Sequence, residues 1–331
     1  MSVHYLETGS VVPCYNLAFE QYVLEHCLDG DWLLLWQNAS TIVIGLNQNA
    51  AEEINSAFVE QHGITVVRRM TGGGAVYHDL GNLNYSFISD IGNPEELTIR
   101  RFTAPVCRAL AAMGVDAEVS GRNDILVGGK KVSGVAQRIT DGRILHHGTL
   151  LFDSDPAMIA GALKADPAKF LSKSAKSVRS RVGNIRDFLS SDISFTQFRE
   201  FLLQELTRDG MIRETLSEDA LESVRKLADG KYRTWDWNYG RSPDYAFRNR
   251  AHFPGGTLEV RMDIRQGLIE DIVFFGDFMA TAPLTGLCEA LRGARRDARE
   301  ISDILGRYPV SSLFGGIRKE EILALIMDEG A

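Results

Sequence analysis

Three consecutive glycines, Gly72 to Gly74, stand in the stretch RRMTGGGAVYHDLGN, which runs from Arg68 to Asn82. The segment ITVVRR before them has the composition of a β-strand, so the triplet predicts an abrupt loop at a strand end. Because glycine has no side chain, a ligand can approach this backbone closely, and the N–H groups can act as donors. Such a loop suits a phosphate or a carboxylate, although a plain tight bend is the alternative interpretation.

The glycine loop matches neither of two common nucleotide-binding patterns. No Gly-Lys followed by serine or threonine stands at the spacing of a P-loop, and GGGAVY lacks the third glycine of a dinucleotide fingerprint. Arg68 and Arg69 should face opposite sides of the preceding strand, so one of them is expected to point into a site. His78, beside Asp79, is interpreted as a hydrogen-bonding residue of the loop, with a general base as the alternative.

A second cluster of polar residues lies in SGRNDILVGGKKVSGVAQR, residues 120–138. Lys130 and Lys131 should face opposite ways on the strand after the Gly128-Gly129 turn, one toward solvent and one inward. Small residues follow Lys131 and leave room for a ligand, although solvation is the ordinary state of a hairpin lysine. Asp124 is either a turn former or a ligand for the magnesium ion that accompanies a nucleotide.

The third cluster is LHHGTLLFD, which holds two adjacent histidines. Side chains of neighbouring strand residues point to opposite faces, so His146 and His147 are not expected to bind one metal ion together. We expect one histidine in the core and the other near the site. The four cysteines have no metal-ligand spacing, and structural zinc is not expected.

Apolar runs and turn signals predict the elements around these clusters. DWLLLWQN and TIVIGLNQ are predicted as strands joined by the Ala39-Ser40 turn, and a helix is predicted over about 50–62, ending at Gly63. The elements expected next are strands at AVYHD and NLNYSFIS, a helix over about 95–113, a β-meander from 115 to 153 and helices at about 156–164, 194–208 and 216–228. Turns of the meander are expected at Gly128-Gly129 and Asp141-Gly142.

A composition shift near residues 240–250 predicts two domains. The expected organisation is a catalytic domain of residues 1–240, a linker of residues 241–250 and a C-terminal domain of residues 251–331. Strands TLEVRMDI and LIEDIVFFGD followed by helices make the last unit a small α+β domain. LRGARRDARE within it is expected to be helical, with its arginines on an ordinary solvated face.

Composition and charge exclude several classes of protein. The 331 residues are 44% hydrophobic, enough for globular cores, and the net charge of −8 argues against nucleic-acid binding. An anionic partner would need a local patch such as Arg179, Arg181 and Arg186. No apolar run is long enough to span a membrane, and MSVHYLETGS lacks the features of an export signal, so a cytoplasmic protein is expected.

Taken in order and at these separations, the three clusters resemble the lipoate–protein ligase family, as do SVRSRVGNI and KYRTWDWNYGRSPDY further on. The resemblance covers the whole chain. It implies an α/β (α+β) fold: a mixed sheet with flanking helices, as in biotin and lipoate ligases, plus a small α+β C-terminal accessory domain. It also implies an enzyme that uses ATP and Mg²⁺ to adenylate lipoate and then lipoylates a lysine of a carrier protein.

The resemblance further implies roles for particular residues. Arg69 and the backbone of Gly74, Ala75, Val76 and Tyr77 would contact the adenylate. Lys131 would be catalytic and hold both the phosphate and the lipoyl carbonyl, and Asp124 would bind magnesium. The partners implied are apo lipoyl domains of 2-oxoacid dehydrogenase acyltransferase subunits and the glycine-cleavage carrier protein, in lipoate salvage. The enzyme is expected to act as a monomer, with loops around Arg179–Asn184 closing over the adenylate.

Five other interpretations stay open at this point. An octanoyltransferase of the same scaffold would need a cysteine beside the lysine, and residues 115–153 contain none. A transferase that accepts lipoyl-AMP but has lost adenylation would keep the same motifs. A biotin ligase would be expected to show a GRGR-type loop in place of RRMTGGG. From another class, the chain could bind lipoate without catalysis, or carry these motifs by accident.

Overall fold

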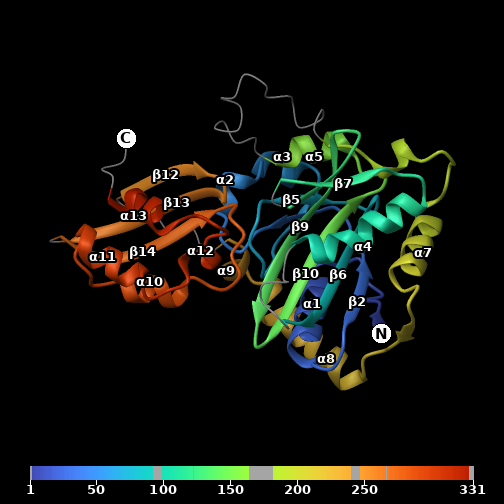
Figure 1. Ribbon diagram of the computed structural model, residues 1–331, viewed down its shortest axis with the longest axis horizontal. Coiled ribbons are helices and arrows are strands. Elements are labelled where there is room, and N and C mark those ends of the chain that lie inside the picture. The colour runs from blue at the N-terminus through green and yellow to red at the C-terminus, as the bar shows by residue number, and fades with distance from the viewer. Residues whose placement is uncertain are drawn as a thin grey trace.

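The structure is a computed structural model that describes residues 2–91, 99–121, 123–163, 182–239, 247–265 and 267–327. It comprises a large domain and a small domain, which Figure 1 shows side by side. The large domain contains an eight-stranded and a three-stranded sheet, and the small domain contains a further three-stranded sheet. The predicted linker stays a prediction: residues 240–246 lie outside the described residues, and the first strand of the small domain begins at Phe247.

The eight-stranded sheet forms the centre of the large domain, with the order β11-β1-β2-β6-β10-β9-β8-β7. Its strands are β1(Val3–Leu6), β2(Trp32–Trp36), β6(Asn82–Asp90), β7(Ala117–Ser120), β8(Asp124–Val127), β9(Lys130–Thr140), β10(Arg143–Leu151) and β11(Met211–Arg213). Strands β11, β1 and β2 pair in parallel, and the other pairs are antiparallel. The sheet is therefore mixed, as the predicted fold class required.

The β-meander follows the sequence prediction closely. Gly128 and Gly129 join β8 to β9 with φ of 56° and 76°, and Asp141 and Gly142 join β9 to β10 with φ of 47° and 78°. Positive φ at both central residues gives a hairpin turn whose twist matches that of the flanking strands. The meander brings Asp124, near the start of β8, opposite Gly134 on β9.

A smaller sheet of order β4-β3-β5 lies beside the large one. It consists of β3(Thr41–Ile44), β4(Thr65–Arg68) and β5(Val76–His78). Strands β2 and β3 follow each other in sequence, as predicted, but they enter different sheets, and so do β5 and β6. The chain crosses twice between the two sheets, and the glycine loop between β4 and β5 lies at this junction.

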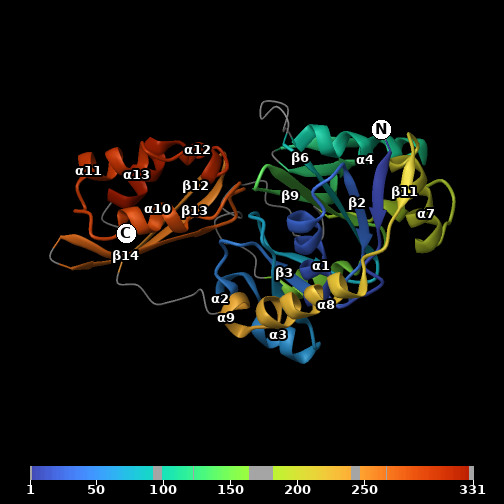
Figure 2. The same ribbon diagram turned by 90° about the horizontal axis from the view of Figure 1, so that it is seen from below.

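Helices cover both faces of the large sheet, with α4 on one side and α8 on the other (Figure 2). The helical segments of the large domain are α1(Pro13–His26), α2(Ala50–Glu53), α3(Ser56–Gln61), α4(Ile99–Ala112), α5(Pro156–Ala162), η3(Ile185–Phe188), α7(Phe195–Leu206), α8(Glu218–Leu227), η4(Ala228–Tyr232) and α9(Trp235–Asn238). The predicted helix over 50–62 is broken in two, because Asn55 caps the start of α3 through its side chain. Helix α1 was missed, since it is buried on most sides and shows no amphipathic period.

The small domain packs helices on the sheet β12-β13-β14. Its elements are β12(Phe247–Phe253), β13(Gly256–Arg265), β14(Leu268–Gly276), α10(Thr285–Leu291), α11(Ala298–Leu305), α12(Val310–Leu313) and α13(Lys319–Met327). The helix predicted over LRGARRDARE was wrong in its centre, because α10 ends at Leu291 and α11 begins at Ala298. Arg292 there pairs with Asp271 at 2.6 Å, and Arg296 donates to the carbonyl of Ile326.

These observations confirm the predicted fold class, a mixed sheet with flanking helices and a small α+β domain. The two domains have separate hydrophobic cores, the small one built around β13 and α11. None of the helices in the described residues has the length and apolar character that a membrane crossing requires.

Gly81→Ala should destabilise the large domain by about 1–3 kcal/mol. Gly81 lies between β5 and β6, and its carbonyl accepts from the nitrogens of Phe152 and Asp153. A Cβ there would fall 2.7 Å from the Ser154 nitrogen and closer still to the Asp153 carbonyl, so backbone would have to move. Urea denaturation followed by circular dichroism measures the loss. Gly230→Ala, with nothing within 4 Å of the added atom, is the control and should be at least as stable as the wild type, because alanine favours the helical backbone of η4.

Candidate functional site

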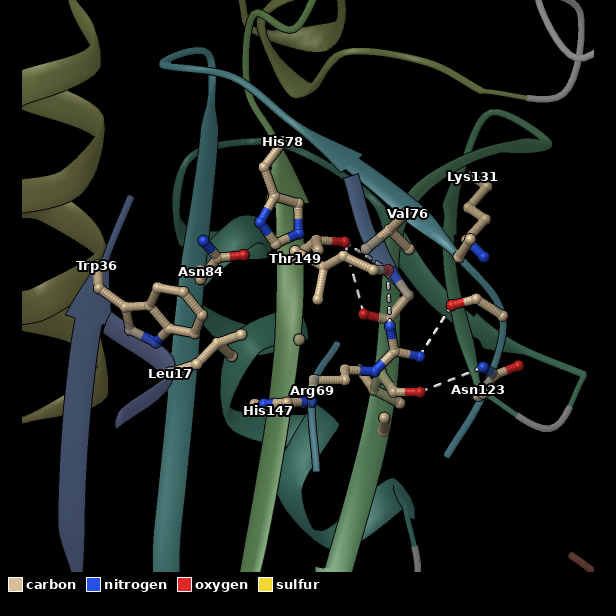
Figure 3. A pocket seen from close by; sticks show the side chains of 18 residues that line it. Leu17, Trp36, Arg69, Val76, His78, Asn84, Asn123, Lys131, His147 and Thr149 are labelled. Atoms are coloured by element: carbon tan, nitrogen blue, oxygen red, sulfur yellow. Dashed lines mark hydrogen bonds between the residues drawn. The ribbon is translucent and has the colours of Figure 1, made fainter. Parts of the chain in front are cut away.

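The glycine loop covers a cavity that lies between the two sheets of the large domain (Figure 3). Side chains from β2, β6, β9 and β10 line one wall, and the glycine loop, β3 and β5 line the other. The lining residues are Leu17, Trp36, Val43, Arg69, Gly73, Gly74, Ala75, Val76, His78, Asn84, Asn123, Lys131, Gly134, Val135, Ala136, His147, Gly148 and Thr149. Members of all three sequence clusters therefore meet at one cavity.

The floor of the cavity is a row of residues that runs across the large sheet. Trp36 pairs with Asn84, and Asn84 pairs with Thr149. The hydroxyl of Thr149 then accepts from the nitrogen of Gly134, which is paired with Asp124. Because the row crosses strands, it extends by about 4.8 Å at each step. It ends at Trp36 on one side and beside Lys131 on the other, and Figure 3 shows these two residues at opposite sides of the cavity.

Lys131 and Asp124 form an ion pair at the second end of the row. Lys131 Nζ lies 2.7 Å from Asp124 Oδ1, and both side chains are about one-third exposed, at 34% and 33%. Lys130 next to them is exposed, so the predicted division of the two lysines is confirmed. A Cβ on Gly134 would come within 3.1 Å of Lys131 Nζ, so the glycine makes room for the lysine to lie over the sheet.

The chain returns to Lys131 after the arginine-rich segment. The nitrogen of Gly183 donates to the Lys131 carbonyl at 3.0 Å, and Val182 forms a β-bridge with Lys131. Arg179 and Arg181, named as a basic patch and as part of a closing loop, lie outside the described residues. Arg186 pairs with Asp153 at 2.6 Å and with Asp192 at 2.7 Å, on the surface.

Arg69 lies behind the glycine loop and is buried. Its guanidinium donates to the carbonyls of Val43, Gly72 and Gly74 at 2.7–3.2 Å and to the hydroxyl of Thr71 at 2.9 Å. Burial lowers the pKa of Arg69 to about 10, which still leaves it charged at neutral pH. Arg69 thus lines the cavity while holding the loop in shape.

Arg68 faces the opposite way, as expected for neighbours on a strand. Its guanidinium is fully buried and donates to carbonyl oxygens of two chain segments, 45–48 and 237–238. The expectation that one arginine of the pair points into the site is therefore confirmed for Arg69.

Of the four residues that follow Gly73, three line the cavity and one does not. Gly74, Ala75 and Val76 line it. The side chain of Tyr77 points away, and its hydroxyl lies 3.0 Å from Ser40 Oγ. Any contact of Tyr77 with a ligand in this cavity would therefore have to come from its backbone. A backbone contact is what the resemblance in the sequence implied for this residue.

A buried polar chain behind the cavity was not found from the sequence. Glu20 on α1 accepts from His147 Nδ1 at 2.9 Å, and His147 Nε2 lies 2.9 Å from Thr71 Oγ1. Thr71 also accepts from Arg69, so the chain connects α1 and β10 to the glycine loop. Ser86 donates to Glu20 as well. The sequence gives only one signal of this hydrogen-bonded series, which is the lone carboxylate of Glu20 within the apolar segment NLAFEQYVL.

The histidines are divided as predicted. His147 lines the cavity, whereas His146 stacks on Phe102 in the core with a ring distance of 5.0 Å. Burial lowers the pKa of His146 to about 3. His78 lines the cavity and is hydrogen-bonded to Asn38 at 3.1 Å. Burial, reinforced by the charge of Arg69, lowers the pKa of His78 to about 3, so both rings are neutral at pH 7.

The small domain contacts the glycine loop directly. The nitrogen of Gly73 donates to the Phe278 carbonyl at 3.1 Å, and the nitrogen of Gly276 donates to the Asn47 carbonyl at 2.8 Å. A Cβ on Gly72 would lie 2.6 Å from Phe278 O and 2.7 Å from Ala280 N. The loop is thus held between its own domain and the segment that follows β14.

Two comparisons with protein families match most of the chain. The family described as lipoyl protein ligase A/B catalytic domain matches residues 13–207. The family described as bacterial lipoate protein ligase C-terminus matches residues 242–326. Together they cover both domains of the structure.

Individual proteins are similar over nearly their whole lengths. Lipoate-protein ligase LplJ of Bacillus subtilis is 44% identical over 95% of this chain and 96% of its own. A crystal structure of lipoate-protein ligase A bound with ATP is 30% identical with a TM-score of 0.62, over 72% of this chain and 98% of its own. A bi-partite lipoate protein ligase from Thermoplasma acidophilum, studied with its E2 lipoyl domain, is 31% identical with a TM-score of 0.64, over 74% and 98%.

The lowered pKa values of the two buried histidines predict that the free energy of unfolding depends on pH. His78 and His146 have folded pKa values near 3, below the ordinary value of 6.5, so the unfolded chain binds more protons between these limits. Stability is therefore complete above pH 6.5 and falls as the pH drops, by about 2 kcal/mol for each histidine at pH 5. Urea denaturation at pH 7 and pH 5 measures this loss.

His146→Gln should remove about half of the loss attributed to the pair, because it leaves only His78 to be protonated on unfolding. His62→Gln, a change at an exposed histidine, is the matched control and should keep the wild-type pH dependence. Equal pH dependence in His146→Gln and the wild type would contradict the assignment.

Proposed function

This chain belongs to the lipoate–protein ligase family, and from that premise we propose that it adenylates free lipoate with ATP and transfers the lipoyl group to a lysine of apo lipoyl domains. The resemblance drawn from the three sequence clusters is confirmed, and the protein is a ligase. The proposal adds the two half-reactions, the residues that perform them and a role in lipoate salvage.

The observation that carries the proposal is the polarity of the cavity. The Lys131 ammonium lies at the end away from Trp36 (Figure 3), and the Arg69 guanidinium and the backbone of Gly74 to Val76 also line the cavity. The other end is enclosed by Leu17, Trp36 and neutral His78. A carboxylic acid with a long apolar tail fits this arrangement, with its head at the charged end and its tail along the row toward Trp36.

In the first half-reaction, the lipoate carboxylate attacks the α-phosphorus of ATP, pyrophosphate leaves and lipoyl-AMP forms. Two anions must approach each other, and fixed positive charge and N–H donors reduce their repulsion. We assign this role to Lys131, with Arg69 and the Gly74-to-Tyr77 backbone holding the adenylate. Lys131 must then exchange its ion pair with Asp124 for contacts with the substrates.

Asp124 is suited to a magnesium ion that arrives with ATP. Across the described ranges, no group of three or more histidine, cysteine, aspartate or glutamate side chains is arranged to hold a metal. Magnesium in nucleotide sites usually takes only one or two carboxylates, with phosphates and waters as its other ligands. We propose that Asp124 supplies that carboxylate; the ion would neutralise phosphate charge.

In the second half-reaction, the ε-amino group of the acceptor lysine attacks the acyl carbonyl and AMP leaves. An unperturbed lysine has a pKa near 10.4, so a neutral amine at pH 7 costs about 4.6 kcal/mol. A positive charge close by disfavours a second one, so Lys131 would lower this cost. It would also stabilise the negative charge that develops on the carbonyl oxygen.

A cysteine thioester route, as in an octanoyltransferase, has no support in the cavity. None of Cys14, Cys27, Cys107 and Cys288 is among the described residues that line it. Burial raises the pKa of each of these thiols, which makes them weaker nucleophiles at neutral pH. A transferase that uses preformed lipoyl-AMP is the second candidate, because it would need the same Lys131.

The proposed partners are apo lipoyl domains of 2-oxoacid dehydrogenase acyltransferase subunits and the glycine-cleavage carrier protein. The Thermoplasma acidophilum relative studied with an E2 lipoyl domain supports this class of partner. We propose a cytoplasmic enzyme that acts as a monomer and uses neither nucleic acid nor membrane. With a net charge of −8, it would meet an acidic carrier through a local basic patch.

The purified protein should catalyse lipoate-dependent exchange of pyrophosphate into ATP when magnesium is present. Addition of an apo lipoyl domain should then shift the mass of that domain by one lipoyl group. Exchange tests the first half-reaction and the mass shift tests the second. Transfer from supplied lipoyl-AMP without any exchange would favour the transferase instead. The absence of both exchange and transfer would refute the proposal.

Lys131→Ala should lower the exchange rate by at least about 10²–10³, the effect of losing one donor at a developing charge. Lys130→Ala is a matched control, since Lys130 is the adjacent lysine on β9 and is exposed. The control should retain wild-type exchange. A Lys131→Ala protein that folds normally and exchanges at the wild-type rate would remove Lys131 from the catalytic assignment.

A further inference from the structure

Two buried hydrogen-bond donors line the cavity without an acceptor. His78 and Asn84 are 3% and 2% exposed. His78 Nε2 and Asn84 Nδ2 have no hydrogen-bond partner among the residues that the structure describes. Leaving a buried polar group unsatisfied destabilises a protein, so such groups in a binding cavity indicate a ligand atom that can accept from them.

The hydrogen bonds around His78 fix which ring nitrogen carries the proton. Asn16 Nδ2 donates to Asn38 Oδ1 at 2.9 Å, so the Asn38 amide turns its nitrogen toward His78. That nitrogen lies 3.1 Å from His78 Nδ1, which must therefore accept. Because the ring is neutral, with a pKa near 3, its single proton resides on Nε2. His78 thus presents an N–H group to the cavity.

Asn84 forms a side-chain hydrogen bond with a neighbour on the same strand. Its Oδ1 accepts from Asn82 Nδ2 at 3.0 Å, and its own amide nitrogen has no partner among the described residues. The amide belongs to the row on the cavity floor, directly beside Trp36. In Figure 3, Asn84 and Trp36 lie together on the side of the cavity away from Lys131.

The position of Asn84 relates it to the far end of the substrate. Asn84 on β6 and Asp124 on β8 are three strands apart in the sheet order, which places them roughly 14 Å apart at about 4.8 Å for each strand. This inference rests on the proposed function, in which the carboxylate of the acid lies beside Lys131. The tail of the acid then ends near Asn84 and His78, and in lipoate that end carries two sulfur atoms.

We propose that His78 and Asn84 are specificity residues that select a chain ending in sulfur over a plain hydrocarbon chain of the same length. A sulfur atom is a weak hydrogen-bond acceptor, and it also packs favourably among apolar groups. A dithiolane ring can therefore satisfy the two donors without requiring a wet cavity. A methylene chain leaves them unsatisfied, and sites built around hydrogen bonds discriminate strongly against ligands that lack the partner atom.

The test compares the dissociation constants of lipoate and octanoate by calorimetry. Asn84→Leu removes one donor and keeps a similar volume. It should weaken lipoate, strengthen octanoate and lower the preference for lipoate by about tenfold. His78→Phe should act in the same direction. His62→Phe, the same exchange at an exposed histidine that does not line the cavity, is the control and should keep the wild-type preference.

The outcomes separate this inference from the proposed function. If the wild type binds neither acid, the proposed function fails and the inference fails with it. If the wild type binds both, but Asn84→Leu and His78→Phe keep its preference, only the inference is wrong. A preference that changes as much in His62→Phe would show that the effect does not depend on a donor in the cavity and would overturn the role of the two donors.

A measurement on the unmutated protein tests the same proposal without requiring any variant to fold. In ¹⁵N-histidine-labelled protein at pH 7, His78 should show the resonances of a neutral ring protonated at Nε2. Lipoate should shift the Nε2–H signal, and octanoate should shift it much less. Equal shifts with both acids, or a ring protonated at Nδ1, would contradict the proposal.

Discussion

Two adjacent buried guanidinium groups hold this site together. Placing a charge in a protein interior is costly unless hydrogen bonds satisfy it, and bonds from a charged donor are stronger than neutral ones. Arg68 and Arg69 obtain these bonds from backbone carbonyls of the glycine loop, of the segment after β3 and of α9. Each arginine requires several carbonyls in fixed positions at once, so the three segments cannot shift independently.

Each of the three positions after these arginines holds a glycine for a different physical reason. Gly72 lacks a side chain because the small domain's Phe278 and Ala280 pack against it. Gly73 adopts a φ of 87° that favours glycine and lies against Arg69. Gly74 alone of the three has room for a Cβ, whose nearest neighbour would be Asp277 Cβ at 3.8 Å, and it lines the cavity together with Gly73. Ligand approach and a tight bend, considered as alternatives from the sequence, are therefore both present in one triplet.

The sequence predicted local elements well and long-range pairing poorly. The meander with its two positive-φ turns, helices α5, α7 and α8, and the division of Lys130 from Lys131 all follow from periods and turn residues that span a few positions. By contrast, nothing local shows that β2 and β3 enter different sheets, because the Ala39-Ser40 turn looks the same in either case. Glu20 escaped notice for a related reason: its partner His147 stands 127 residues away.

Burial acts on the two ends of the cavity with opposite results. Desolvation disfavours the charged form of every base, so it lowers the pKa of both Arg69 and His78. Arg69 starts from 12.5 and reaches only about 10, so it keeps its charge at pH 7. His78 starts from 6.5 and reaches about 3, so it loses the charge it could otherwise carry. Burial of both groups therefore leaves a charged guanidinium and a neutral imidazole in the lining of one cavity, and this difference is what the proposed orientation of a carboxylate ligand relies on.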